Sequence, residues 1–305
     1  MTRPRGFAVF AYAWAILLAH LIGVSLPGVE AAPKHKKPPC WVERNYNTIS
    51  RIYNMTVYPN QLPILVGGAA AVPKELFNKN VVGRVNPVGK FTDFETSIEY
   101  FFVLAPVPQA NPLKGAITSY KITSFSSQCR NVAASMVNLY LAVYDPGSPD
   151  HGKPLAPIRQ LAFWRFDDKG AVIKYDAYIS NLNDWYESTV GTSINDPQLQ
   201  AATIQELCQV TQSRCTGANA QWSSFDECVS ALSAKPYGSY NGVWGDHVVC
   251  RTIHLILTQL RPDVHCSHVG PTGGGKCIDV PFPQNYFSDE ELFGDPLGET
   301  FQCDY

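Results

Sequence analysis

The nine cysteines of this 305-residue chain are distributed unevenly, and this distribution constrains its fold more than any other feature. One cysteine, Cys129, lies between Trp41 and Gln200, while Cys40 and Cys303 stand near the two ends. The other six lie close together, at Cys208, Cys215, Cys228, Cys250, Cys266 and Cys277. A short region with so many cysteines is expected to be cross-linked by disulfides, because it is too small to bury a large core. The sequence does not choose among the many pairings that six cysteines allow.

The N-terminal residues give a reason to expect oxidised cysteines. Arg3 and Arg5 precede a long apolar run from Phe7 to Gly28, and small residues follow it. This is the layout of a secretory signal peptide, with cleavage expected after Ala31. The alternative is a retained membrane anchor, because the apolar run is long enough to span a bilayer. We predict a secreted protein, and Asn54, which begins an Asn-Met-Thr sequon, is a candidate glycosylation site.

Charge and motif content limit the partners that the chain is expected to have. The net charge is −2 with neutral histidines, which predicts no nucleic-acid partner, and membrane contact only through a retained N-terminal segment. Gly270 to Lys276 has the G-x-x-x-x-G-K spacing of a phosphate-binding loop, but Cys277 stands where a magnesium-binding Ser or Thr is needed. No helix is expected to follow, so no nucleotide partner is predicted. We interpret the three glycines as a tight loop that brings Cys277 to a disulfide partner.

The change in cysteine content near residue 195 predicts a boundary between two domains. The expected divisions are a signal peptide at 1–31, a basic and proline-rich linker at 32–43, a first domain at 44–195, a cysteine-rich helical domain at 196–280 and an acidic C-terminal tail at 281–305. We expect the tail to be extended and to lie along the surface of the protein.

The first domain combines helical and strand patterns. Residues 45–58 and 92–105 have apolar side chains at helical spacing. Strand-like alternation follows in the runs 116–128, 135–145, 159–166 and 171–179. Asp167 to Gly170 is a good hairpin turn between the last two runs. This order predicts an α+β fold in which a curved antiparallel sheet covers helices.

Two segments carry a resemblance to a known superfamily. They are LFNKNVVGRVNPVGKFTDFETSIEYFF (76–102) and PIRQLAFWRFDDKGAVIKYDAYI (157–179). Over about residues 44–185 the chain resembles the NTF2-like, SnoaL-like superfamily. The resemblance implies a cone with a deep apolar pocket, in a group that includes polyketide cyclases, dehydratases, ketosteroid isomerases and non-catalytic binding modules. Fold alone does not choose among these functions. A homodimer formed through the sheet is a further expectation.

Enzymes with this fold often use a pocket carboxylate or an Asp–His pair to move a proton next to a carbonyl group. His151, the one histidine of the first domain, is expected in a loop, so the pair is not expected on the sheet. The remaining polar candidates are Asp93, Glu95, Glu99, Arg159 and Asp176. We select Asp176 as the candidate catalytic base and Tyr178 as its hydrogen-bond donor. The alternative is that Asp176 is an exposed carboxylate beside Lys174.

Aromatic and basic residues of the strands supply a candidate pocket for a small apolar ligand. The candidate pocket residues are Tyr140, Tyr144, Arg159 and Trp164. These aromatic residues are equally suited to packing in an ordinary core, and the sequence leaves both interpretations open.

Three helices are expected in the cysteine-rich domain, at 197–212, 222–234 and 246–262, with Pro262 ending the third. Cys129 is the best candidate for a free thiol, and Cys40 is a candidate partner for Cys303. No organic cofactor is expected in any part of the chain.

Three histidines of this domain form a candidate metal site. His254, His265 and His268 are close in sequence to Cys250 and Cys266 and are candidate ligands for Zn or Cu. A carboxylate such as Asp246 or Asp279 is a candidate further ligand. The alternative is that they are ordinary histidines of a disulfide-rich domain, because cysteines in disulfides cannot ligate a metal as thiolates.

These observations leave three functions open. The first is a secreted binding protein whose cone holds a small apolar ligand. The second is a secreted isomerase, cyclase or dehydratase that uses a pocket carboxylate. The third is a structural or effector-type interaction protein without a ligand.

Overall fold

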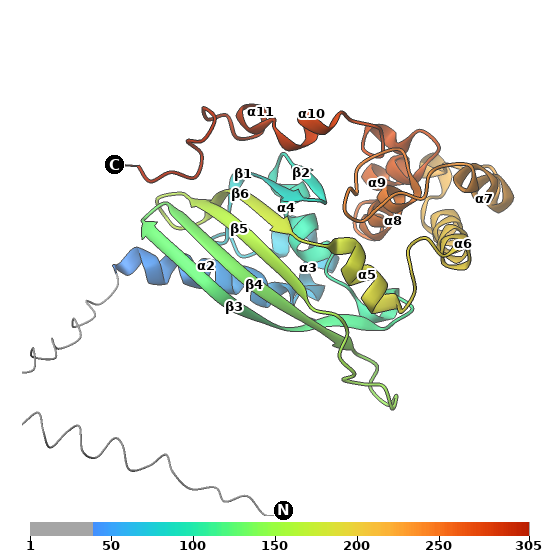
Figure 1. Cartoon of the computed structure of the whole chain (residues 1–305), viewed down its shortest axis with the longest axis horizontal. Helices are drawn as coiled ribbons and strands as arrows, with labels where there is room; N and C mark the ends of the chain where they lie inside the picture. Colours follow the sequence, from blue (N-terminus) through green and yellow to red (C-terminus); the bar gives the residue numbers. More distant parts are fainter. Residues whose placement is uncertain (1–38, 305) are drawn as a thin grey trace, which may run out of the picture. The chain divides into compact units, whose positions relative to one another are not determined.

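The computed structural model describes residues 39–304, and its central element is a six-stranded curved sheet (Figure 1). The strand order is β2-β1-β6-β5-β4-β3. The strands are β1 Phe77–Asn86, β2 Gly89–Phe91, β3 Gly115–Cys129, β4 Val132–Val143, β5 Ile158–Phe166 and β6 Val172–Ile179. The curved sheet over helices confirms the predicted α+β class.

The sheet is mixed, so the prediction of a wholly antiparallel sheet is wrong at one pair of strands. β3 to β6 form an antiparallel meander with the expected hairpin turn before β6, whereas β1 pairs with β6 in parallel. Parallel neighbours need a long connection rather than a hairpin. Here the connection is the whole stretch of chain between β1 and β6. Local sequence patterns do not show that two strands so far apart in the sequence are paired.

The N-terminal half of the described chain contains the helices that the sheet covers. They are α2 Cys40–Thr56, α3 Leu62–Gly67, the 3-10 turn η1 Gly68–Ala71, α4 Phe94–Ile98, the π-helical turn η2 Glu99–Val103 and the 3-10 turn η3 Pro108–Ala110. Ile49, Ile52 and Tyr53 of α2 are buried in one core with the inner side chains of the sheet. Their helical spacing produces the apolar stripe that faces the sheet.

The side chains inside the cone pack closely against one another. The ring of Phe101 has its centroid 5.9 Å from that of Trp164 and 5.1 Å from that of Tyr175. Trp164 is fully buried, and its Nε1 donates a hydrogen bond to Ser135 Oγ at 2.9 Å. Tyr53 donates a hydrogen bond from its hydroxyl group to Gln160 Oε1 at 2.6 Å. These groups form the core of the cone.

The helical region after the sheet is held together by three disulfides. Its elements are α5 Leu182–Val190, α6 Pro197–Arg214, η4 Gly217–Asn219, α7 Phe225–Ser233, α8 Val248–Leu257, α9 Pro262–Val269 and η5 Gly273–Gly275. Cys208–Cys228 joins α6 to α7, Cys215–Cys266 joins the end of α6 to α9, and Cys250–Cys277 joins α8 to the residues after η5. The predicted cross-linking of all six cysteines is confirmed. Pro262 follows α8, as predicted, and it is also the first residue of α9.

The C-terminal segment crosses the outer face of the sheet, where α10 Phe282–Tyr286 and α11 Asp289–Phe293 interrupt its extended course (Figure 1). Arg84 Nη1 of β1 lies 2.6 Å from Asp289 Oδ1. Lys174 Nζ of β6 lies 2.5 Å from Asp295 Oδ2, and Arg165 Nη2 of β5 lies 2.8 Å from Asp304 Oδ1. The acidic residues of the tail therefore pair with basic residues of three strands.

The predictions for the three other cysteines are wrong. Cys129 is not a free thiol, because it forms a disulfide with Cys303 that fastens the tail to the end of β3. Cys40 is exposed at the start of α2 and is the free cysteine. The paired residues are 174 positions apart in the sequence, so no local spacing indicates the pairing.

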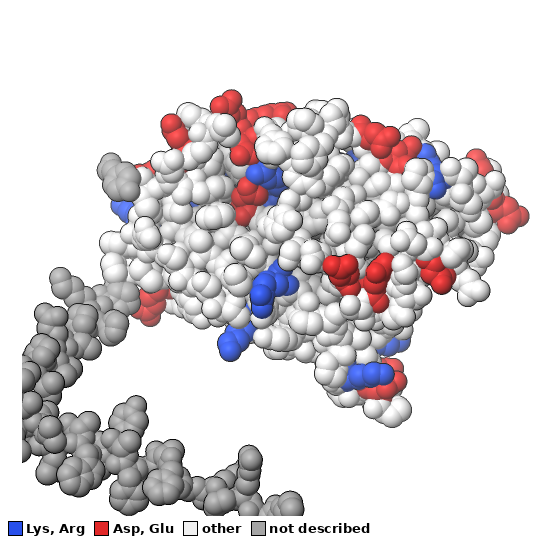
Figure 2. Space-filling model, viewed as in Figure 1, with Lys and Arg blue, Asp and Glu red and all other residues white. Residues whose placement is uncertain are grey.

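The part of the sheet that the tail leaves open carries few charges on the face shown in Figure 2. Tyr140, Leu161, Phe163 and Tyr178 are exposed apolar or aromatic side chains of β4, β5 and β6. A homodimer formed through the sheet stays a prediction.

The signal peptide and its alternative, a membrane anchor, lie outside the described residues. Between residues 39 and 304, no helix has both the length and the apolar character needed to cross a bilayer. The boundary expected near residue 195 falls in the loop between α5 and α6 and stays a prediction.

Candidate functional site

The candidate site is a group of three histidines on two packed helices. His254 lies on α8, and His265 and His268 lie on α9. The two α9 histidines are three residues apart, which places them on the same face of that helix. His265 and His268 are buried, and His254 is half-buried. We call these three residues the histidine cluster.

The ring nitrogens of the histidine cluster converge on one point. Nδ1 of His254 lies 3.3 Å from Nδ1 of His265 and 3.2 Å from Nδ1 of His268. Nδ1 of His265 lies 3.2 Å from Nδ1 of His268. The three nitrogens therefore form a nearly equilateral triangle. The structure thus brings together all three residues that the sequence singled out as candidate metal ligands.

A buried glutamate from the cone adjoins the histidine cluster. Glu99, the first residue of the π-helical turn η2, is 3% exposed. Its Oε1 lies 3.0 Å from His265 Nε2 and 2.6 Å from Arg261 Nε. π-Helical turns are rare and are frequent at functional sites. Here η2 directs its aromatic rings into the cone and Glu99 toward α9, so the site lies where the cone meets the helical region.

The contact with Glu99 orients the ring of His265. The Glu99 oxygen that Arg261 holds accepts hydrogen bonds, so His265 Nε2 is the donor in its contact with that oxygen. The other ring nitrogen of His265, Nδ1, faces the other two histidines. The Glu99–His265 pair therefore directs Nδ1 toward the centre of the triangle.

His254 and His268 are uncharged at neutral pH. Burial, together with the nearby His268 and His265, lowers the pKa of His254 well below its usual value. Burial and the nearby His265 lower the pKa of His268 to about 4. A buried imidazole without an anionic partner avoids the charged form because the interior solvates a charge poorly. Neutral rings retain the lone pairs that bind a metal ion or accept a proton.

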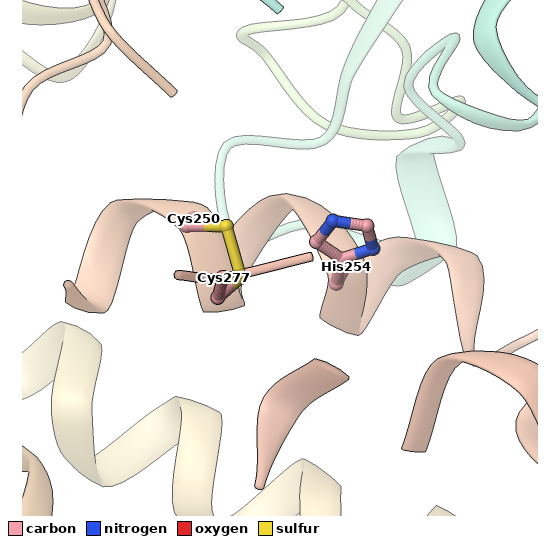
Figure 3. A group of neighbouring side chains, drawn as sticks. All are labelled: Cys250, His254 and Cys277. Atoms are coloured by element: carbon pink, nitrogen blue, oxygen red, sulfur yellow. A yellow bond between two sulfur atoms is a disulfide. The ribbon is translucent and has the colours of Figure 1, made fainter. Parts of the chain in front are cut away.

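A second group, Cys250, His254 and Cys277, has the composition of a metal site but not its chemistry. Figure 3 shows the two sulfur atoms bonded to each other, with His254 one turn further along α8. A disulfide sulfur is not a thiolate and does not ligate a metal as one. The bond instead ties the glycine-rich segment to α8 beside the histidine cluster.

The glycine-rich segment packs against the histidine cluster, which explains its composition. Gly273 to Gly275 all have positive φ, and the turn brings Cys277 to Cys250 as predicted. A Cβ atom on Gly274 would lie 2.8 Å from His268 Cδ2 and 2.6 Å from Ser267 Oγ. A Cβ atom on Gly275 would have no neighbour within 4 Å. Gly274 is therefore required by packing as well as by its backbone angle.

These two glycines provide a matched pair of substitutions. Gly275→Ala should cost about 1–2 kcal/mol of unfolding free energy, because alanine is strained at positive φ. Gly274→Ala should cost about 1–3 kcal/mol more, because its methyl group displaces His268 and Ser267. Denaturant unfolding of both variants measures the difference. Equal losses would contradict the close packing of this loop on His268.

The candidate catalytic residues of the sheet lie elsewhere. Asp176 does not face the interior of the cone, as a pocket base must. It lies on the outer face, where its Oδ2 is 2.5 Å from Arg84 Nη2. Tyr178 is exposed on the same face. The position of Asp176 agrees with the alternative of a paired outer carboxylate, although its partner is Arg84 and not Lys174.

The four candidate pocket residues do not lie together. Trp164 is buried in the core of the cone, and Tyr140 is exposed on the outer face of β4. Arg159 donates a hydrogen bond to Asn138 Oδ1 at 3.0 Å on that outer face. Tyr144 stacks edge-on against Tyr58 beyond the end of β4. These residues therefore do not line one common pocket.

The remaining candidate residues, Asn54, Asp246 and Asp279, lie away from the three Nδ1 atoms. Asn54 is exposed near the end of α2, and its glycosylation stays a prediction. Asp246 pairs with Lys235 and Arg251, and Asp279 accepts a hydrogen bond from the backbone N–H of Asp246. Neither carboxylate is among the groups that contact the histidine cluster. The carboxylate that contacts the cluster is Glu99, and it contacts Nε2 of His265 and not the three Nδ1 atoms.

The roles of Glu99 and Arg261 were not predicted from the sequence. Glu99 was one of several candidate carboxylates, but nothing in its neighbourhood indicates that it is buried against a helix more than 160 residues later. Its one signal is its place in an apolar stretch, EYFFV, where a buried carboxylate needs a partner.

The chain therefore combines three features: a cone-shaped sheet, a disulfide-linked helical region, and a histidine cluster where the two meet. The BfoA N-terminal domain model matches residues 50–177, and the BfoA family C-terminal domain model matches residues 173–280. The chain is thus similar to both domain models of the BfoA family, in adjoining segments. The two matches overlap within β6.

Curated relatives match almost the whole chain. Aurasperone B biosynthesis cluster protein A of Aspergillus niger is 29% identical over 286 residues, covering 89% of this chain and 90% of that protein. Bifonsecin B biosynthesis cluster protein A of Aspergillus brasiliensis is 28% identical over 298 residues, covering 93% of this chain and 96% of that protein.

Solved structures are similar to about half of the chain. A candidate SnoaL-like polyketide cyclase from Jannaschia sp. CCS1 has a TM-score of 0.34 and 12% identity, covering 51% of this chain and 97% of its own. A phenazine biosynthesis-related protein from Pseudomonas aeruginosa also has a TM-score of 0.34, with 11% identity, covering 54% of this chain and 93% of its own.

Proposed function

We propose that the protein is an enzyme of small-molecule biosynthesis whose reactive centre is the histidine cluster with Glu99. The curated relatives, which extend over about nine tenths of the chain, are named as biosynthesis cluster proteins. Their names support a role in making a small organic metabolite. The proposal keeps the isomerase, cyclase or dehydratase alternative and moves its carboxylate from Asp176 to Glu99.

The observation that carries this proposal is the buried Glu99–His265 pair beside two neutral imidazoles. A carboxylate that accepts a hydrogen bond from one ring nitrogen makes the other nitrogen more basic and fixes its direction. Isomerisation, cyclisation and dehydration each need a proton moved, or an oxygen polarised, on an organic substrate. Converging lone pairs in a site shielded from water suit that task. The half-buried His254 is the member of the cluster closest to solvent.

Ligand binding inside the cone has weaker support. Trp164, Tyr175 and Phe102 are fully buried there, and they pack into a continuous aromatic core. The outer carboxylate Asp176 is held by Arg84, which suits a structural role. The apolar-ligand and effector hypotheses stay predictions.

Replacement of single residues in the producing organism tests the proposal. His265→Ala and Glu99→Gln should each lower the amount of the pathway product about 10-fold or more and cause a precursor to accumulate. The first change removes the imidazole, and the second removes the carboxylate that orients it. Chromatography with mass spectrometry of culture extracts measures both compounds. His151→Ala is the control, because His151 lies in a distant surface loop.

Protein amount and disulfide content should be measured in parallel, so that a loss of product is not a loss of protein. Unchanged product from well-folded His265→Ala protein would refute the assignment. If Asp176→Asn then abolished the product instead, the base would lie on the outer face of the sheet.

We also propose secretion, which is supported by the oxidised state of eight cysteines. N-terminal sequencing of the protein from the culture medium should find residue 32 first. Protein that is retained in cells and still begins at Met1 would contradict this.

A further inference from the structure

We propose that the histidine cluster binds one divalent transition-metal ion, with Zn²⁺ as the preferred ion, through the three Nδ1 atoms of His254, His265 and His268. This inference concerns the same site as the proposed function. It rests on that function only where it assigns the bound metal a role in catalysis. The binding itself follows from the geometry of the described residues.

The distances between the nitrogens are those of a metal site. A tetrahedral zinc ion about 2.0–2.1 Å from each imidazole nitrogen places neighbouring ligand nitrogens about 3.3–3.4 Å apart. The three Nδ1–Nδ1 distances are 3.2, 3.2 and 3.3 Å. Three side chains from two helices thus meet at the separations that one small cation requires.

Hydrogen bonds among the rings cannot pair all three Nδ1 atoms, which lie 3.2, 3.2 and 3.3 Å apart. Each imidazole nitrogen has one in-plane direction, which carries either a proton or a lone pair. One hydrogen bond therefore uses two of these nitrogens and leaves the third without a partner. An unpaired polar atom in a buried site is unfavourable. A cation at the centre is attracted by all three at once.

The surroundings supply the outer interactions typical of a metal site. A ligating histidine usually donates its other ring N–H to a carboxylate, which fixes the ring and makes it a better ligand. Glu99 accepts that bond from His265, and Arg261 Nε holds the same Glu99 oxygen at 2.6 Å. Gly274 closes on His268, and the disulfide of Cys250 lies one turn before His254.

The ligand set favours zinc and leaves one position open. Imidazole suits Zn, Cu, Fe and Ni, whereas Ca and Mg prefer oxygen ligands. Three protein ligands and an exogenous oxygen ligand form the usual arrangement of catalytic zinc, while structural zinc has four protein ligands. The metal would therefore present a Lewis acid to an oxygen atom of a small organic substrate.

Metal titration of the tag-free secreted chain tests the inference without any substrate. Chelator-treated protein, with its four disulfides verified by mass mapping, is titrated with Co²⁺ and then with Zn²⁺. We expect one Co²⁺ per chain with the strong visible absorption of a four-coordinate ion, and its displacement by one equivalent of Zn²⁺. His151→Ala should bind both ions as the unaltered protein does.

Substitutions in the site should weaken binding in a graded manner. Glu99→Gln should weaken Zn²⁺ binding about 10–100-fold, because it removes the outer carboxylate. His265→Ala and His268→Ala should weaken it more than Glu99→Gln does. Folding of each variant is checked by its disulfide map and circular dichroism.

The inference is overturned if the correctly cross-linked, unaltered chain binds no stoichiometric metal, or if folded His265→Ala and His268→Ala bind it as tightly as the unaltered chain. Its failure differs from that of the proposed function. Absent metal with loss of product in His265→Ala would leave an acid–base histidine site. Bound metal with unchanged product in that variant would leave a structural metal and refute the enzyme assignment.

Discussion

Replacement of Trp164 by alanine should lower the free energy of unfolding by about 3–5 kcal/mol. Trp164 is fully buried, and its ring lies near those of Tyr53, Phe101 and Tyr175. The change removes these contacts, opens a cavity and leaves Ser135 Oγ without its partner. Denaturant unfolding monitored by circular dichroism measures the loss.

Leu161→Ala is the matched control for Trp164→Ala, because Leu161 belongs to the same strand but is exposed on its other face. Its cost should stay within about 0.5 kcal/mol, as for most surface substitutions. If both variants lost equally little, the cone would not be filled by its own aromatic side chains. A hollow cone would instead favour the hypothesis that the cone binds a small apolar ligand.

The second large effect is expected from the disulfide between α6 and α9. The double variant Cys215→Ser, Cys266→Ser should lose about 4 kcal/mol of stability, because the bridge closes a segment of 51 positions in the unfolded chain. Cys266 follows His265 directly, so freeing α9 should also weaken metal binding by the histidine cluster. Unfolding and Co²⁺ titration of the same preparation measure both effects.

Cys40→Ser is the control for this double variant, because Cys40 is exposed and makes no disulfide. It should change neither stability nor metal binding. If the double variant lost stability but bound Co²⁺ as before, the disulfide would not be what holds α9 in position for the histidine cluster.

Much of the fold could be predicted because its signals are local. The hairpin of β5 and β6 follows from alternation on both sides of Asp167 to Gly170, and Gly170 has positive φ in the turn. The apolar spacing of Ile49, Ile52 and Tyr53 predicted α2. The crowding of cysteines predicted cross-linking without its pattern, since spacing does not show which helices pack together.

The rest could not be predicted because it depends on contacts between distant parts of the chain. A carboxylate inside a strand favours a pocket position for Asp176, but its partner is Arg84, 92 positions earlier in the sequence. The tail pairs its Asp289, Asp295 and Asp304 with strand residues that lie more than 120 positions earlier in the chain.

Part of the candidate site could be predicted from the sequence. The histidines could be named because they are close along the chain. Their triangle could not be predicted, because it depends on the packing of α8 against α9, which begins at the same Pro262 that follows α8. The contact with Glu99 could not be predicted, because Glu99 lies 166 positions before His265. The interpretation of Gly273 to Gly275 as a loop serving Cys277 was correct, but its packing on His268 was not foreseen.

The most direct test of the histidine cluster is X-ray diffraction from crystals of the secreted chain grown with Zn²⁺, with data collected on both sides of the zinc absorption edge. The metal account predicts one anomalous peak about 2.0–2.1 Å from each Nδ1 atom of His254, His265 and His268. A map with zinc bound elsewhere, and with no anomalous signal between these three nitrogens, would contradict it.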